Sequence, residues 1–168
     1  MDIINRRRSI RQFTDEPIEK EKIEALLRAA MQAPSAKNQQ PWRYLVVQEE
    51  QRLQEMASLT PYSKLLGRAK AAIVVLTDTS NLSLPDMVAA DMGATTQNIL
   101  LEATSLGLGS CWIGVYGRAE RVDATKQLLN LPAHFLPFSI VALGYPLHKE
   151  DLRFIDRFDP TKVFYEKI

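Results

Sequence analysis

Four arginines and a serine lie within six residues near the N-terminus, in the segment from Arg6 to Arg11, called here the arginine segment. Each guanidinium carries a planar fork of donors that can hold two phosphate oxygens, and Ser9 adds a compact hydroxyl. Charged hydrogen bonds of this kind contribute roughly 1.5–3 kcal/mol each. The pattern predicts a site for an anion such as a phosphate monoester, while a solvated basic segment without a ligand is the alternative that this stretch leaves open.

A second polar stretch, called here the amide loop, runs from Ala33 to Trp42 and contains two prolines, three amide side chains and a serine. It follows an expected helix and leads directly into an expected strand. Ordinary connections of this type are usually shorter and need fewer hydrogen-bonding groups. The composition favours a rigid loop with a binding role over a simple connection.

Four glycines occur in the eleven residues from Gly107 to Gly117. The spacing lacks the third glycine of a dinucleotide-binding fingerprint, and the glycines close a helix instead of opening one. The sequence has no GxxxxGK[ST] motif either. A Rossmann site and a P-loop are therefore excluded, and a bound phosphate must be held by side chains.

Three other residue types that often carry chemistry have simpler interpretations. His134 and His148 are isolated and fit no metal-ligand spacing, so we expect no metal site. Cys111 lies in an apolar strand with no histidine near it in sequence, which favours a small core residue over a nucleophile. As the only cysteine, it also excludes an intramolecular disulfide and agrees with a cytoplasmic location.

The totals limit the partners and the number of domains. With 21 basic and 20 acidic side chains in 168 residues, no broad positive face is expected to bind nucleic acid or anionic membrane. The longest apolar run, from Ala69 to Leu76, contains Lys70 and is too short to span a bilayer. We expect one domain over residues 1–168, paired with a second copy.

Hydrophobic periodicity predicts a mixed chain with helices over 18–33, 51–59, 88–106 and 119–129. Strands are expected over 43–47, 71–77 and 138–143, and residues 110–117 are expected to form a strand and a turn. The unbroken apolar centre from Ile73 to Leu76 indicates a strand buried on both faces. Small residues in the first half of the long helix favour either a buried spine or a dimer seam. The tail 150–168 is apolar without a regular period, which predicts that it wraps a partner subunit.

The segments RRRSIRQF, APSAKNQQPW and GLGSCWIGVYG, in this order, resemble the FMN-dependent nitroreductase family over essentially the whole chain. The resemblance implies an α+β fold, a three-layer α-β-α sandwich with a mostly antiparallel central sheet. It also implies an intertwined homodimer with an extended C-terminal tail. Two FMN molecules would then lie in clefts at the interface, each held by residues of both chains.

The resemblance further implies a set of residues around FMN. Within the arginine segment, Arg7 and Ser9 correspond to phosphate and ribityl contacts, Arg8 lies beside the ring system, and Arg11 lies near N1 and O2. The partner chain contributes residues of the amide loop, namely Pro34, Ser35, Ala36 and Asn38. The family often has a second serine where this chain has Ala36. Next to the ring are Trp112, Ile113 and Gly114, the last with its N–H towards N5. Arg157, in preference to Arg153, is a further phosphate ligand, and Ser63 and Lys64 align poorly with another family ligand.

The implied activity is an FMN-dependent oxidoreductase that takes a hydride from NAD(P)H and reduces nitroaromatic, quinone or similar small acceptors by a ping-pong mechanism. Hydride transfer needs no side-chain acid or base, so no catalytic residue is named. The short connector from Asp78 to Asp86 implies an open acceptor site. Alternatives are an FMN-binding carrier or sensor without turnover, a specialised flavoenzyme such as a dehalogenase, and a basic arm for nucleic acid.

Overall fold

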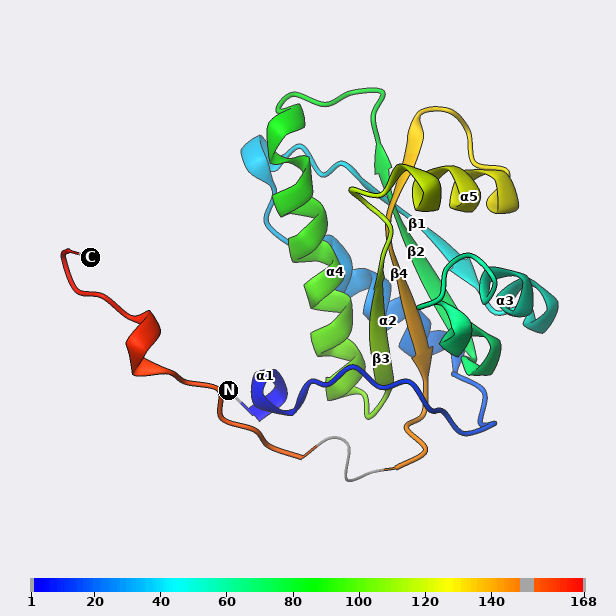
Figure 1. The fold of residues 1–168 in the computed structure, drawn as a ribbon, viewed down its shortest axis with the longest axis horizontal. Coiled ribbons are helices and arrows are strands. Elements are labelled where there is room, and N and C mark those ends of the chain that lie inside the picture. The colour runs from blue at the N-terminus through cyan, green and yellow to red at the C-terminus, as the bar shows by residue number, and fades with distance from the viewer. Residues whose placement is uncertain (1, 149–152, 168) are drawn as a thin grey trace.

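The computed structural model describes residues 2–148 and 153–167, and at its centre is a four-stranded sheet (Figure 1). The strands are β1 (Trp42–Val47), β2 (Ala71–Asp78), β3 (Gly109–Gly114) and β4 (Phe135–Gly144). They lie in the order β1-β2-β4-β3, and all three pairings are antiparallel. The predicted central place of the strand over 71–77 is confirmed, while β1 and β3 form the edges.

Two hydrophobic cores lie on the two faces of this sheet, because successive side chains of a strand point to opposite faces. In β2, Ile73 and Val75 belong to the core on one face, and Val74 and Leu76 belong to the core on the other. All four side chains are almost completely buried. This double burial explains why the strand has no polar alternation.

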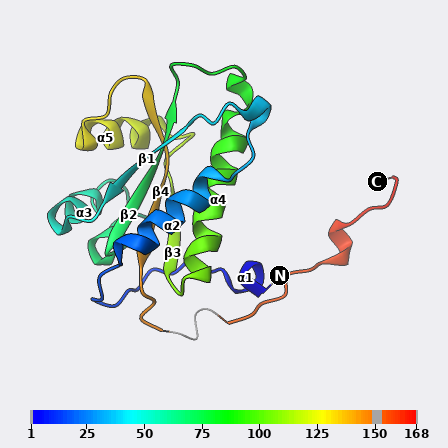
Figure 2. The same ribbon diagram turned by 180° about the vertical axis from the view of Figure 1, so that it is seen from behind.

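Helices cover both faces (Figures 1 and 2). The residues of α2 (Lys20–Met31) and α4 (Val88–Ser105) pack in the first core, and those of α3 (Glu50–Met56) and α5 (Ala119–Leu129) contact the second. The three-layer α+β sandwich predicted from the sequence is confirmed. Unpredicted elements are the short helix α1 (Asp2–Arg6) and the 3₁₀ turns η1 (Ala36–Asn38), η2 (Lys64–Arg68), η3 (Pro85–Met87) and η5 (Pro160–Lys162), which are too short to show a periodicity.

The arginine segment is fixed against the ends of β3 and β4. The backbone N–H of Ile10 donates to the carbonyl of Ser110 at 2.9 Å, and Ile10 and Phe13 are buried in the second core. A Cβ on Gly109 would lie 2.7 Å from the Ile10 side chain, and one on Gly144 would lie 2.7 Å from Phe13. Glycine at these two positions therefore lets the N-terminal backbone lie close to the sheet.

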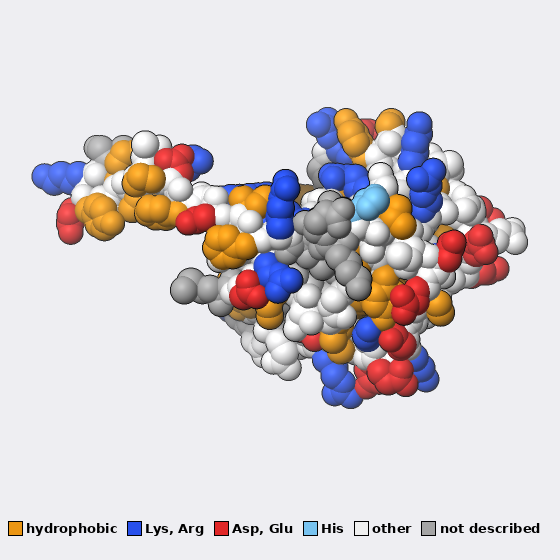
Figure 3. Space-filling view, turned by 90° about the horizontal axis from the view of Figure 1, so that it is seen from below, with side chains coloured by type: hydrophobic (Ala, Val, Ile, Leu, Met, Phe, Trp, Pro, Cys, Tyr) orange, Lys and Arg blue, Asp and Glu red, His pale blue; other side chains and the backbone are white. Residues whose placement is uncertain are grey.

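The described part of the tail, residues 153–167, crosses the N-terminal segment and then leaves the body of the molecule (Figures 1 and 3). The N–H of Ile155 donates to the carbonyl of Asn5 at 3.3 Å. Beyond it, the large apolar side chains of Phe158, Phe164 and Tyr165 are 58–81% exposed. That the tail wraps a second copy stays a prediction. Within the described ranges, no helix combines the length and the apolar composition needed to cross a bilayer.

Candidate functional site

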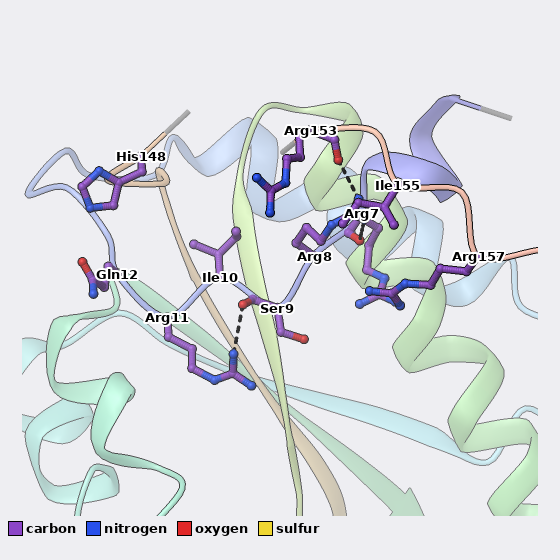
Figure 4. Close-up of a pocket in the computed structure, with 10 residues that line it drawn as sticks. All are labelled: Arg7, Arg8, Ser9, Ile10, Arg11, Gln12, His148, Arg153, Ile155 and Arg157. Atoms are coloured by element: carbon purple, nitrogen blue, oxygen red, sulfur yellow. Dashed lines mark hydrogen bonds between the residues drawn. The ribbon is translucent and has the colours of Figure 1, made fainter. Parts of the chain in front are cut away.

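The arginine segment and the start of the described tail form an open cleft, called here the arginine cleft (Figure 4). Its volume is about 650 Å³, within the size range of small-molecule and cofactor sites. Five of its ten lining residues are arginines, and these come from opposite ends of the chain. The ten residues are Arg7, Arg8, Ser9, Ile10, Arg11, Gln12, His148, Arg153, Ile155 and Arg157.

The positive charge in this cleft is not neutralised within the described part of the chain. Arg7, Arg153 and Arg157 make no side-chain hydrogen bond or ion pair to a described residue. The guanidinium of Arg11 donates to the backbone carbonyl of Ser9 at 3.2 Å, and no carboxylate pairs with it. A cluster of like charges without counter-ions is an arrangement that an anion stabilises.

Arg8 differs from the other arginines because its guanidinium is committed to backbone carbonyls. It donates to the carbonyls of Asn5 at 2.8 Å and Arg7 at 2.7 Å, and across the chain to Arg153 at 2.6 Å. Desolvation lowers the pKa of Arg8, and the charges of Arg157, Arg7 and Arg153 lower it further. Arg8 therefore joins the tail to the arginine segment, and its lowered pKa reflects desolvation first and then repulsion by the neighbouring arginines.

The amide loop has a strained backbone held by a buried carboxylate. Lys37, Asn38 and Gln40 have φ of 49°, 53° and 45°, a region that residues other than glycine rarely adopt. Asp91 of α4 is 4% exposed and accepts hydrogen bonds from the N–H of Ala36 at 2.9 Å and the side-chain amide of Gln39 at 2.6 Å. The loop is thus anchored to the first turn of α4.

Gln39 also joins the amide loop to the connector between β2 and α4. Its side-chain amide accepts from the N–H of Leu84 at 3.0 Å and donates to the carbonyl of Leu84 at 3.2 Å, as a paired strand residue would. Ser35 accepts from the N–H of Gln40 at 3.0 Å, and Pro34 and Asn38 are exposed. The loop therefore presents exposed groups on a fixed backbone.

The amide loop and the arginine cleft lie at opposite ends of α4 (Figure 1). The loop is bonded to Asp91, near the start of the helix, whereas the arginine segment pairs with Ser110, shortly after the helix ends at Ser105. The fourteen residue steps from Asp91 to Ser105, at 1.5 Å of rise each, span roughly 20 Å of helix. One chain therefore does not bring these two predicted parts of the site together.

The third predicted part lies on the open edge formed by β3. Trp112 is 36% exposed and its ring lies 6.0 Å from that of Phe138, whereas Ile113 is only 3% exposed and packs in the second core. The Ile113 side chain is therefore directed away from any ligand on the outer edge. A Cβ on Gly114 would meet no atom within 4 Å, and this open space above the backbone fits a ligand that approaches Gly114 closely.

The remaining residues that the sequence analysis considered are Ser63, Lys64, Cys111, His148 and Arg153. The Ser63 side chain is fully buried and donates to the carbonyl of Thr60 at 2.7 Å, whereas Lys64 is exposed. Burial raises the pKa of the Cys111 thiol, although the charge of Arg11 opposes this, so a packing role fits Cys111. Arg153, the less favoured of the two tail arginines, lines the arginine cleft together with Arg157, and so does His148, which its isolated position in the sequence did not assign to the site. No group of three metal-binding side chains occurs among the described residues.

The similarity to known proteins extends over the arginine segment, the amide loop and β3. A model of the nitroreductase family matches residues 4–60 and 51–145. An Archaeoglobus fulgidus protein named NADH dehydrogenase/NAD(P)H nitroreductase is 44% identical over 99% of this chain and 97% of its own length. A solved Clostridium acetobutylicum structure named NADH oxidase is 44% identical, with a TM-score of 0.96 and 99% coverage of both chains. A Desulfovibrio desulfuricans nitroreductase solved in complex with FMN is 30% identical, with a TM-score of 0.83 and coverage of 99% and 95%.

Proposed function

The chain belongs to the nitroreductase family, and from this premise we propose that it is an FMN-dependent oxidoreductase that uses NAD(P)H to reduce small acceptors such as nitroaromatics and quinones. The observation that carries the proposal is the arginine cleft. It holds five guanidinium groups without a carboxylate partner among the described residues, which is the environment that a phosphate dianion stabilises.

Within this proposal, the residues present fit a bound FMN. Arg7, Arg157 and Ser9 line one cleft and supply donors for a phosphate, and Arg153 lies in the same cleft as a second tail donor. Arg8 has the different role of holding the tail in place through the Arg153 carbonyl. Arg11 lines the same cleft, and its positive charge acts on Cys111 in the neighbouring strand β3.

We propose that a second copy of the chain completes each site. The amide loop lies roughly 20 Å along α4 from the arginine cleft of its own chain, so Pro34, Ser35, Ala36 and Asn38 would contact the cofactor held by the partner. The exposed apolar side chains of the tail support the same arrangement, because a second subunit would bury them. Asp91 and Gln39 would then fix the loop in the geometry that the partner's site requires.

Bound FMN would supply the redox chemistry, accepting a hydride from the nicotinamide and passing the electrons to the acceptor. The chain's own part is binding, orientation and electrostatics. The guanidinium groups stabilise the negative charge that accumulates on reduction. The N–H of Gly114 offers a donor at the open edge, and the connector from Thr79 to Leu84 carries no helix or strand that could cover the site. An uncovered site is consistent with acceptors of several shapes.

The visible spectrum of the purified protein, before and after anaerobic addition of NADH or NADPH, tests this proposal. We expect flavin absorption bands that disappear on reduction and return when a nitroaromatic or a quinone is added. Flavin that stays oxidised with both nicotinamides would instead indicate a carrier or sensor. A colourless protein that does not take up added FMN would refute the assignment of the arginine cleft.

A further inference from the structure

A guanidinium outside the arginine cleft holds the backbone at the end of β3. The side chain of Arg121, in the first turns of α5, donates from Nη1 to the carbonyl oxygen of Gly114 at 2.9 Å. Gly114 is the last residue of β3, and β3 is an edge strand. Arg121 thus contacts the open edge of the sheet from the face that α5 covers.

The direction of the Gly114 backbone groups follows from the alternation along an antiparallel strand. The Val115 N–H donates to the carbonyl of Phe138 in β4, so Val115 faces the sheet. The Ser110 carbonyl accepts from Ile10, on the opposite side, so Ser110 faces outward. Gly114 lies four residues after Ser110 on the same strand, so its backbone groups point the same way. Both its N–H and its carbonyl therefore lie on the outer edge.

Little else in the described chain fixes the orientation of this backbone. Gly114 has no side chain, and a Cβ placed there would have no neighbour within 4 Å. Directly after it, the N–H groups of Val115 and Tyr116 share the Phe138 carbonyl, at 3.2 and 2.9 Å, as the strand turns away. The hydrogen bond from Arg121 is therefore the side-chain contact that holds Gly114 at the point where regular pairing ends.

The groups around the Arg121 guanidinium also favour its charged form. The ring of Tyr62 lies over the guanidinium, with its centroid 5.3 Å from the guanidinium carbon. The arginine makes no ion pair with a carboxylate among the described residues, so its positive charge is not compensated there. An aromatic face on one side and a backbone carbonyl on the other both favour the charged guanidinium.

We propose that Arg121 is a positioning residue for the flavin reaction, acting through Gly114. By holding the Gly114 carbonyl it restrains the backbone of the residue whose N–H lies on the same edge, and it places a positive charge beside that edge. This inference rests on the proposed function. Because positive charge favours the reduced and more negative flavin, Arg121 raises the midpoint potential of the bound cofactor.

The test compares Arg121→Gln with Arg118→Gln in the FMN-loaded protein. Arg118 is an exposed arginine at the N-terminus of the same helix, and its side chain makes no hydrogen bond or ion pair to a described residue. The two variants lose the same formal charge, but only one loses the Gly114 contact. The readout is the two-electron midpoint potential, measured by equilibration with a reference dye, together with the dissociation constant of oxidised FMN.

We expect Arg121→Gln to bind reduced flavin about tenfold less tightly relative to oxidised flavin, which lowers the two-electron potential by about 30 mV. Arg118→Gln should stay close to the wild type. Arg121→Lys keeps the charge and should recover most of the potential, and it remains informative if Arg121→Gln folds poorly.

Equal potentials in Arg121→Gln and Arg118→Gln, with FMN bound in both, would overturn the positioning role and leave the proposed function intact. A change in FMN affinity or folding without a change in potential would also overturn it, because a merely structural contact predicts that result. A wild-type protein that binds no FMN would refute the proposed function itself.

Discussion

Replacing Arg7 by alanine tests the interpretation of the arginine cleft most directly. Arg7 lines the cleft and makes no side-chain hydrogen bond or ion pair to a described residue, so the substitution breaks no internal bond of either kind. The neighbouring Arg6 does not line the cleft, and its guanidinium pairs with Asp2 at 3.2 Å. Arg6→Ala removes the same formal charge from the same segment and is the matched control.

The expected size of the effect follows from one charged hydrogen-bond partner of the phosphate. Such a contact contributes roughly 1.5–3 kcal/mol. At about 1.4 kcal/mol for each factor of ten, the dissociation constant for FMN should rise about 10- to 150-fold. Folding stability should change by no more than about 0.5 kcal/mol, because the substituted side chain has no partner in the described chain.

Titration of FMN with the apoprotein, followed by flavin fluorescence, measures the affinity, and urea unfolding of the apoprotein measures the stability. The difference between wild type and Arg7→Ala should shrink at high salt, because added ions screen the interaction. Equal weakening by Arg6→Ala and Arg7→Ala would refute the reasoning, since only the net charge of the segment would then matter. A large loss of stability in Arg7→Ala would show that the arginine has a structural role instead.

Three further predictions use other parts of the structure. Gly114→Ala should leave the melting temperature nearly unchanged but weaken FMN binding at least tenfold. Gly109→Ala should destabilise the protein by about 1–3 kcal/mol, because its Cβ would lie 2.7 Å from the Ile10 side chain. Equal melting temperatures of the two variants would contradict this difference. Burial raises the pKa of Tyr44 to about 12 from the ordinary value of 10.0, against the smaller opposing effect of its hydrogen bond to Thr95. The stability it contributes is therefore present below pH 10 and lost as the pH rises through about 12, and urea titrations should show that Tyr44→Phe loses less stability over this range. Deleting residues from Leu152 onward should give monomers or aggregates without FMN in light scattering, and a flavin-loaded dimer would disprove the role of the tail.

Much of the architecture could be predicted from the sequence because its signals are local. The helix over 119–129 has the predicted bounds, and the apolar strand over 71–77 lies at the centre of the sheet as expected. The short α1 and the 3₁₀ turns could not be predicted, because elements of three to five residues contain too few positions for a periodicity. Their existence depends on tertiary contacts.

The sequence by itself determined the chemistry available to this protein, through clustered guanidinium groups, a rigid amide loop and a glycine at a strand end. Tertiary structure alone decided how these groups are used. It committed Arg8 to backbone carbonyls, brought Arg153 and His148 into the arginine cleft, and placed Arg121 on the carbonyl of Gly114. The physical reason is that a charged group's role depends on which donors and acceptors lie within about 3 Å of it, and residues distant in sequence supply them only after folding.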